Sequence, residues 1–281
     1  MRKIIALLLV FLCTILFVQS AVTKSKGEQD SNIRRAVEYL TNQFNPEINL
    51  TYESEDQGTH WLRTCDYPDY RWGYSQTYWL TSDNLVAMYA LQPWNPELSH
   101  LINKSLHSYS IPPSGKFEAL FGTLVGPERQ ARNVQVTTTP NTCILARIHN
   151  GSLADPRFRF ADVLVYEALT QFWLGKIPKA HKLIQEVQTM WNGSCIVDSS
   201  IADKHIHKQD QAPSDLDYNT TFKIALLLYA VRVTDYPMSQ EEFRALEDHL
   251  WSRQLENGGI AVAYAIKRNW IKIATSTPIA R

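Results

Sequence analysis

Three aspartates stand at the start of apolar, helix-like runs that contain an Ala-Leu pair: Asp83, Asp162 and Asp217. Carboxyl groups that face each other across a substrate can act as general acid and general base. An aspartate near the start of a helix is also an ordinary cap or a partner of the helix dipole. These residues are therefore the candidate catalytic carboxylates, and a structural role is the alternative for each of them.

A second candidate region is dense in aromatic and arginine side chains. Residues 59–74 read THWLRTCDYPDYRWGY. Flat rings can stack on the faces of sugars, and a guanidinium group can hold a carboxylate. We predict that this segment binds substrate, although its rings could equally cover the top of the core. The candidate binding residues are Trp61, Arg71, Trp72 and Tyr74.

Other polar groups are weaker candidates for a site. Glu118 lies in the predicted β-ribbon segment 116–123, which would have to fold over the candidate carboxylates for Glu118 to act. A metal could in principle be held by alternating His and Asp side chains of one loop, but a single His-x-His in a polar loop is usually no metal site. We therefore predict no metal and no cofactor, and the sequence contains no phosphate-binding glycine loop and no nucleophile elbow. The loop residues are Asp203, His205, His207 and Asp210.

The elements that must position these residues are helices. Apolar spacing and end signals predict seven of them. Asn95-Pro96 and Asp155-Pro156 are typical helix starts, and Ser239 with Glu242 predicts a capping box. The predicted ranges are 32–44, 83–91, 95–107, 155–175, 178–191, 217–233 and 239–255.

The links between the helices predict how they pair. Three links are short, and short links join antiparallel hairpins. The links at about 45–81, 109–154 and 192–216 are long, and because helix direction alternates, they should emerge on one face. Hairpins that cannot each bury two faces are expected to close on one another as a ring or a solenoid. Residues 116–123 and 133–139 predict a small β-ribbon over that face.

This pattern resembles the α/α-toroid, a ring of helix hairpins found in secreted glycoside hydrolases, polysaccharide lyases and terpene-cyclase-like proteins. The resemblance lies in the fold and in the spacing of the helix hairpins. It covers about residues 32–265 and includes no diagnostic catalytic motif. It implies a mainly α fold of the toroid type. A full ring has more hairpins than are predicted here, so we expect a ring that is short, open or truncated. It also implies a site where the inner helices begin, on the long-link face. The segments that carry it are 78–84, 191–193, 222–229 and 251–264.

The N-terminus has the three parts of a secretory signal. Two basic residues precede a short apolar run at 4–18, and small residues follow it. We predict cleavage after Ser20, with an uncleaved N-terminal anchor as the alternative. Residues 21–31 form a polar linker, and residues 32–281 form one domain. Five sequons favour export, although Asn219 is doubtful because a helix should begin there; the others are Asn49, Asn103, Asn150 and Asn192.

The net charge and the cysteine content limit which partners and which disulfide state the sequence predicts. The signal contains two of the 28 basic residues, so the mature chain has 26 basic and 28 acidic residues and a net charge of −2. This balance predicts no nucleic-acid partner. Three cysteines remain after cleavage, and export predicts one disulfide and one free thiol. Three free thiols are the alternative. Cys65 is the favoured member of the pair, with Cys143 or Cys195 as its partner.

Together these features predict a secreted protein that acts on or binds extracellular carbohydrate, as a glycoside hydrolase or a polysaccharide lyase would. Whether the chain is an enzyme is left open. The alternatives are a non-catalytic surface protein that binds a partner, and an inactive toroid fragment. Membrane contact is expected only through an uncleaved N-terminal segment.

Overall fold

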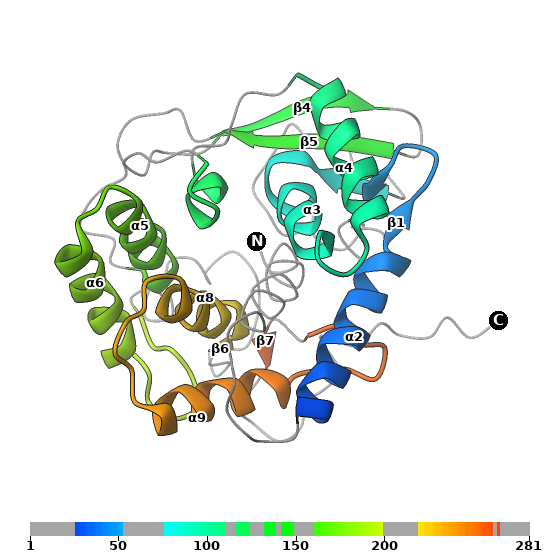
Figure 1. Cartoon of the computed structure of the whole chain (residues 1–281). Coiled ribbons are helices and arrows are strands. Elements are labelled where there is room, and N and C mark those ends of the chain that lie inside the picture. Colours follow the sequence, from blue (N-terminus) through cyan, green and yellow to red (C-terminus); the bar gives the residue numbers. More distant parts are fainter. Residues whose placement is uncertain are drawn as a thin grey trace, which may run out of the picture.

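The computed structural model of the chain is mainly helical and has a small β-structure (Figure 1). This confirms the predicted mainly α class. The structure describes residues 26–52, 76–110, 116–123, 132–138, 142–148, 160–198, 219–260 and 263–264. Within these residues, no helix has both the length and the apolar character needed to cross a bilayer.

Six of the helices form the three predicted hairpins. In each pair the two helices pack against each other across a short link. A further helix, α2 (Lys26–Asn42), begins six residues before the predicted start and includes part of the expected linker. The hairpins are α3 (Leu85–Leu91) with α4 (Pro96–Ser108), α5 (Ala161–Trp173) with α6 (Ile177–Thr189), and α8 (Thr221–Val233) with α9 (Gln240–Trp251).

Local end signals explain two helix starts. The Asn95 side chain accepts a hydrogen bond from the Leu98 N–H at 3.1 Å, with Pro96 in the first turn. Ser239 Oγ accepts from the Glu242 N–H at 3.2 Å and donates to its carboxylate at 2.6 Å. The predicted cap and capping box are therefore confirmed.

Two other predicted helix starts are wrong. Phe160 has an extended backbone, so α5 begins at Ala161 and not at the Asp155-Pro156 signal. Residues 219–220 pair as a strand, β6 (Asn219–Thr220), with β7 (Ala263–Tyr264), so α8 begins only at Thr221. At α8, strand pairing takes residues that the local pattern assigned to the helix, whereas residues 155–159 lie outside the described residues.

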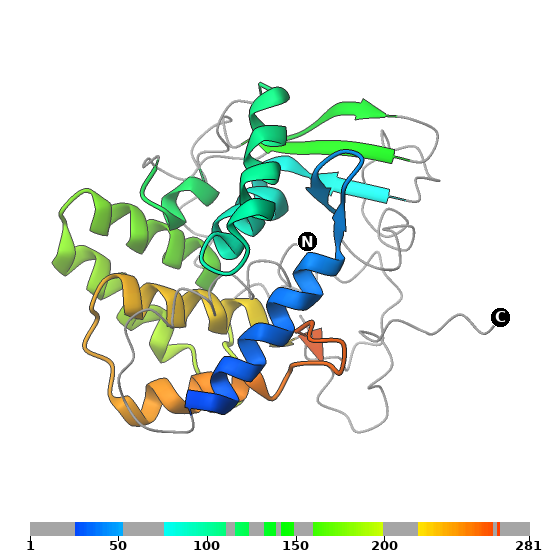
Figure 2. The same cartoon turned by 45° about the vertical axis from the view of Figure 1, so that its right-hand side comes forward.

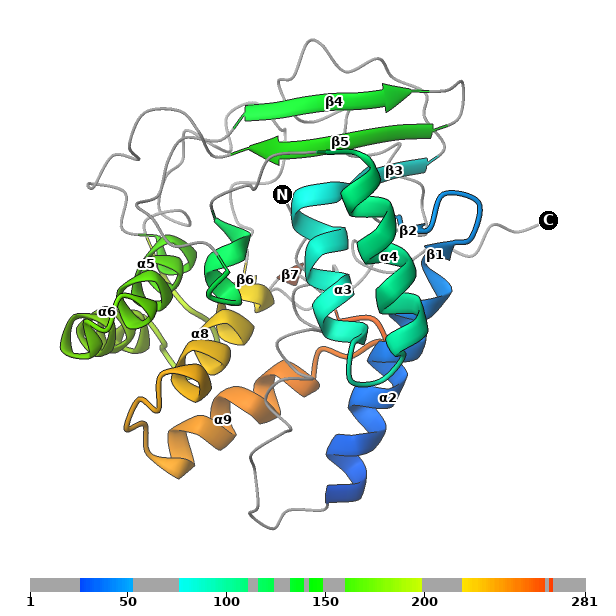
Figure 3. The same cartoon turned by 45° about the horizontal axis from the view of Figure 1, so that its top comes forward.

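The core is centred on α8. Its residues from Ile224 to Ala230 are all buried, which is typical of a helix covered on every side. Helix α8 packs against α5, α6 and α9, and α2 packs against α3. Figures 1 and 3 show the hairpins placed around the molecule with α3, α5 and α8 toward its centre.

Residues 116–123 are not the β-strand that their alternating pattern predicts. Phe117–Leu120 is a 3-10 helix, η2. This segment contacts three helices, through two aromatic rings and one backbone carbonyl. Phe121 stacks on Tyr89 of α3 with centroids 3.7 Å apart, and Phe117 meets Tyr166 of α5 edge-on at 5.9 Å. The Tyr229 hydroxyl of α8 donates to the Leu120 carbonyl.

The link between α4 and α5 nevertheless contains a β-ribbon, in which only the predicted strand at 133–139 is confirmed. It consists of β4 (Arg132–Thr138) and β5 (Thr142–Ile148), which pair antiparallel with a register shift between Gln135 and Thr137. A short strand, β3 (Gln76–Trp79), adds to β5 in parallel, so the sheet order is β3-β5-β4. Another small pair, β1 (Phe44–Asn45) with β2 (Leu50–Thr51), follows α2.

The end of the last hairpin returns to the first helix. Arg35 Nη2 of α2 donates to the Leu255 carbonyl at 2.7 Å, and Gln254 Nε2 donates to the Asn32 carbonyl at 2.7 Å. Gly258 lies directly against the backbone of Arg35. Figure 2 shows α2 crossing beside the end of α9 and β7. The contacts thus run from α2 through α3, η2, α5, α8 and α9 and back to α2.

Candidate functional site

A charged cluster surrounds the N-terminal end of α5. Asp162 lies in the first turn, and Lys116, just before η2, places its Nζ atom 3.7 Å from Asp162 Oδ2. The same ammonium lies 4.6 Å from the centre of the Tyr166 ring. The side chains of Asp162 and Lys116 are 23% and 13% exposed, so the pair is partly accessible to solvent. Figure 3 shows η2 next to α5.

A second ion pair lies beneath the first. Lys223 Nζ in the first turn of α8 is 2.6 Å from Asp198 Oδ2, and these side chains are 4% and 0% exposed. The same oxygen accepts the Ala161 N–H at 2.8 Å, at the start of α5. Asp198 therefore joins the beginnings of α5 and α8, and its negative charge is placed favourably at the positive end of the α5 dipole.

Sequence reasoning missed this buried pair. Lys223 is the one charged side chain in the first ten residues of α8, and that interruption of an apolar helix was a usable signal. Nothing in the sequence distinguishes Asp198 from other loop aspartates. A buried cation needs a partner, so the pattern could have indicated a carboxylate near Lys223 without identifying it.

Asp162 does not cap its helix. The N-cap position of α5 is Phe160, which makes no side-chain cap bond, and the Ala161 N–H is taken by Asp198. The interpretation of Asp162 as a cap is therefore wrong, but its place in the first turn of α5 is that of a partner of the helix dipole, the other structural alternative. Its carboxylate instead faces Lys116, where it can accept a hydrogen bond from a hydroxyl group or take up a proton.

Asp83 lies in a different environment. It belongs to η1 (Leu80–Asn84), a π-helical segment that leads into α3, and it is 1% exposed. Such segments are frequent at functional sites. The next residue, Asn84, accepts from the Thr51 N–H at 2.7 Å and donates to the Thr51 and Trp79 carbonyls at 3.0 Å. In the part of the chain that the structure describes, no hydrogen bond or ion pair joins Asp83 to Asp162.

The remaining predicted site residues lie outside the described residues. They are the catalytic candidate Asp217, the binding candidates Trp61, Arg71, Trp72 and Tyr74, and the loop residues Asp203, His205, His207 and Asp210. Among the described side chains, no group of three or more His, Cys, Asp or Glu residues could hold a metal ion. Glu118 is described, and it is buried in η2 and not carried on a ribbon over the site.

The cysteines give no disulfide in the described regions. Cys143 in β5 and Cys195 after α6 are both buried free thiols, and Cys65 lies outside the described residues. Burial raises the pKa of the Cys143 thiol to about 11, so this thiol is protonated at neutral pH. The predicted disulfide has Cys65 as its favoured member, so it stays a prediction.

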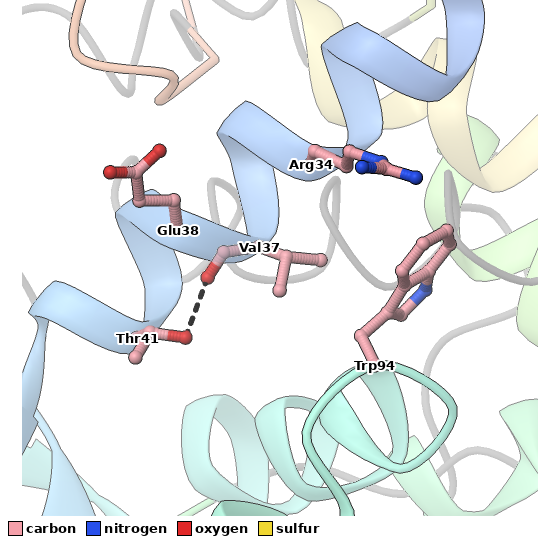
Figure 4. A pocket seen from close by; sticks show the side chains of 5 residues that line it. All are labelled: Arg34, Val37, Glu38, Thr41 and Trp94. Atoms are coloured by element: carbon pink, nitrogen blue, oxygen red, sulfur yellow. Dashed lines mark hydrogen bonds between the residues drawn. The ribbon is translucent and has the colours of Figure 1, made fainter.

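A surface hollow of about 430 Å³ lies between α2 and the α3–α4 link (Figure 4). It is lined by Arg34, Val37, Glu38, Thr41 and Trp94, with the Thr41 hydroxyl donating to the Val37 carbonyl at 2.8 Å. None of the candidate residues is in its lining. We therefore place the candidate site at the N-terminal end of α5 and not in this hollow.

Comparisons of the chain with protein-family models, with curated proteins and with solved structures found no match. The function must therefore be argued from the charged cluster and its position in the fold.

Proposed function

We propose that the helix hairpins form an α/α-toroid-like ring. Support comes from the sequence of contacts that leads from α2 through η2 and the three hairpins back to α2. In such a ring α3, α5 and α8 are the inner helices. The start of an inner helix is then the position at which a central site would be reached.

We further propose that the protein is exported and that it binds or acts on carbohydrate at this end of the ring. The observation that carries the proposal is the solvent-accessible Asp162–Lys116 pair at the first turn of α5. A carboxylate accepts hydrogen bonds from sugar hydroxyls, and an ammonium group donates to sugar oxygens. The buried Asp198–Lys223 pair below them fixes the starts of α5 and α8 and so acts as a positioning element.

In the catalytic form of this proposal, Asp162 exchanges a proton with the substrate. A second carboxyl group would act from the other side of the bond, and Asp217, four residues before α8, is the candidate. A separation of ~5 Å between the two carboxyl groups would give retention of configuration, and ~6.5–9.5 Å would give inversion.

The first test is Asp162→Asn, assayed for binding and turnover on a panel of polysaccharides. If Asp162 transfers a proton, turnover should fall ~10²–10⁴-fold. If it only binds the sugar, affinity should fall about tenfold or more, the range expected for a hydrogen bond to a charged group. The free energy of unfolding should change by no more than about 1 kcal/mol, because the ion pair is partly solvated.

Glu167→Gln is the matched control on the same helix. Its carboxylate is 42% exposed and lies 3.3 Å from Lys179 Nζ, so it is also a lysine-paired acid of α5, but it lies more than one turn further along. This variant should retain binding and turnover. Equal losses in the two variants, or unchanged function in Asp162→Asn, would contradict the proposed site.

A non-catalytic binding protein is the second candidate. It is favoured by the burial of two of the acids near the helix starts, because Asp83 and Asp198, taken as whole residues, are only 1% and 6% exposed. Binding of a glycan without turnover by the unmodified protein would select this candidate over the enzyme.

A further inference from the structure

Three of the five sequons can be compared in the described structure, and they differ in how their asparagines are held. Asn192 is exposed, and so are the next two residues, Gly193 and Ser194. Asn49 and Asn103 are half-buried. An N-linked glycan is bulky and hydrated, so it has to leave the protein surface freely.

In the 192–195 turn the protein uses the amide oxygen of Asn192, and the amide nitrogen is left for a glycan. Asn192 Oδ1 accepts from the Ser194 N–H at 3.0 Å, from Ser194 Oγ at 3.0 Å and from the Cys195 N–H at 2.9 Å. A glycan is attached to the nitrogen and not to this oxygen. All three bonds can therefore persist in the modified protein, and Gly193, with φ of +94°, allows the tight turn.

The other two sequons are built into the fold. In the sequon of Asn49, Leu50 and Thr51 are both fully buried, and Asn49 itself has a φ of +55°. In the sequon of Asn103, on α4, the Ser105 hydroxyl donates to the Ile48 carbonyl at 2.7 Å. Residues of both sequons therefore take part in the contact between α4 and the β1–β2 turn, and neither sequon forms an exposed turn like that of Asn192.

We propose that Asn192 is an N-glycosylation site of this protein. The site is a modification point at the C-terminal end of α6, since α6 ends at Thr189. Because α5 and α6 are antiparallel, the N-terminal end of α5, where Asp162 and Lys116 lie, is at the same end of that hairpin. The proposal depends on export, but it does not depend on what the α5 site binds.

The test is expression of the full chain in a eukaryotic secretory host, followed by peptide mass spectrometry with and without removal of N-glycans by a glycosidase. We expect a glycan on the peptide that contains Asn192. Ser194→Ala should abolish it, because the sequon loses its hydroxyl residue while Asn192 Oδ1 keeps both backbone donors. Ser194→Thr, which preserves the sequon, should retain the glycan.

Asn192→Gln gives an independent variant, and Ser105→Ala removes the Asn103 sequon as a control. The protein should lose one glycan with Asn192→Gln and keep the Asn192 glycan with Ser105→Ala. An unmodified Asn192 peptide in protein recovered from the host would overturn the proposal, whether or not the other sequons are occupied.

Discussion

Lys223→Met should lower the free energy of unfolding by about 3–5 kcal/mol, the cost of leaving one member of a buried ion pair without its partner. Asp198 would remain fully buried beside the start of α5, with the Ala161 N–H still bound to it but without the ammonium at 2.6 Å. Methionine matches the length of the lysine stem, so lost packing contributes little. Urea unfolding of the variant and the parent measures the difference.

The matched control is Lys179→Met. Lys179 is also paired with a carboxylate, at 3.3 Å from Glu167, but its side chain is 55% exposed. A solvent-exposed pair contributes only about 0–1 kcal/mol. If the two methionine variants were equally stable, the Asp198–Lys223 pair would not hold the starts of α5 and α8 together, and its positioning role would be wrong.

Gly258→Ala should be almost as costly, at about 3–4 kcal/mol. Gly258 has a φ of +90°, and a Cβ atom there would collide with the Arg35 carbonyl oxygen and lie 2.7 Å from its carbonyl carbon. Because both atoms belong to the backbone of α2, the clash can be relieved only if the turn moves away from the helix. The hydrogen bonds from Arg35 to Leu255 and from Gln254 to Asn32 would then weaken.

Gly175→Ala separates backbone strain from this contact. Gly175 also has a positive φ, of +75°, but apart from its chain neighbours no atom of the described residues would lie within 4 Å of a Cβ atom there. Its substitution should cost only about 1–2 kcal/mol, the strain of a left-handed residue. Thermal or urea unfolding of both variants gives the comparison. A Gly258→Ala variant as stable as Gly175→Ala would mean that the return of the chain to α2 does not depend on this close approach.

The parts of the fold that depend on neighbouring residues could be predicted from the sequence. The cap at Asn95 and the capping box at Ser239 each involve groups within three residues of each other. The three hairpins follow from short links, and the strand at 133–139 follows from its Val and Thr content. Segment 116–123 could not be predicted, because its 3-10 conformation depends on Tyr89, Tyr166 and Tyr229.

The candidate site was predictable only in part. The sequence predicts Asp162 near the start of an apolar helix, and the structure has it in the first turn of α5. Its lysine partner is 46 positions away in the sequence, and the buried Asp198–Lys223 pair joins a loop to a helix. No local pattern fixes such pairings. Asp83 fits the same pattern as Asp162, but it is enclosed in η1.

The measurement that tests the central claim most directly is a hydrogen-exchange footprint of a bound glycan. The unmodified protein would first be screened against neutral and acidic polysaccharides, and exchange would then be followed with and without the oligosaccharide that binds. The account predicts slower exchange at residues 116–118 and 160–166, around Lys116 and Asp162, and no change at the hollow beside Trp94. Binding to no glycan in the panel, or protection confined to the α2–Trp94 hollow, would contradict it.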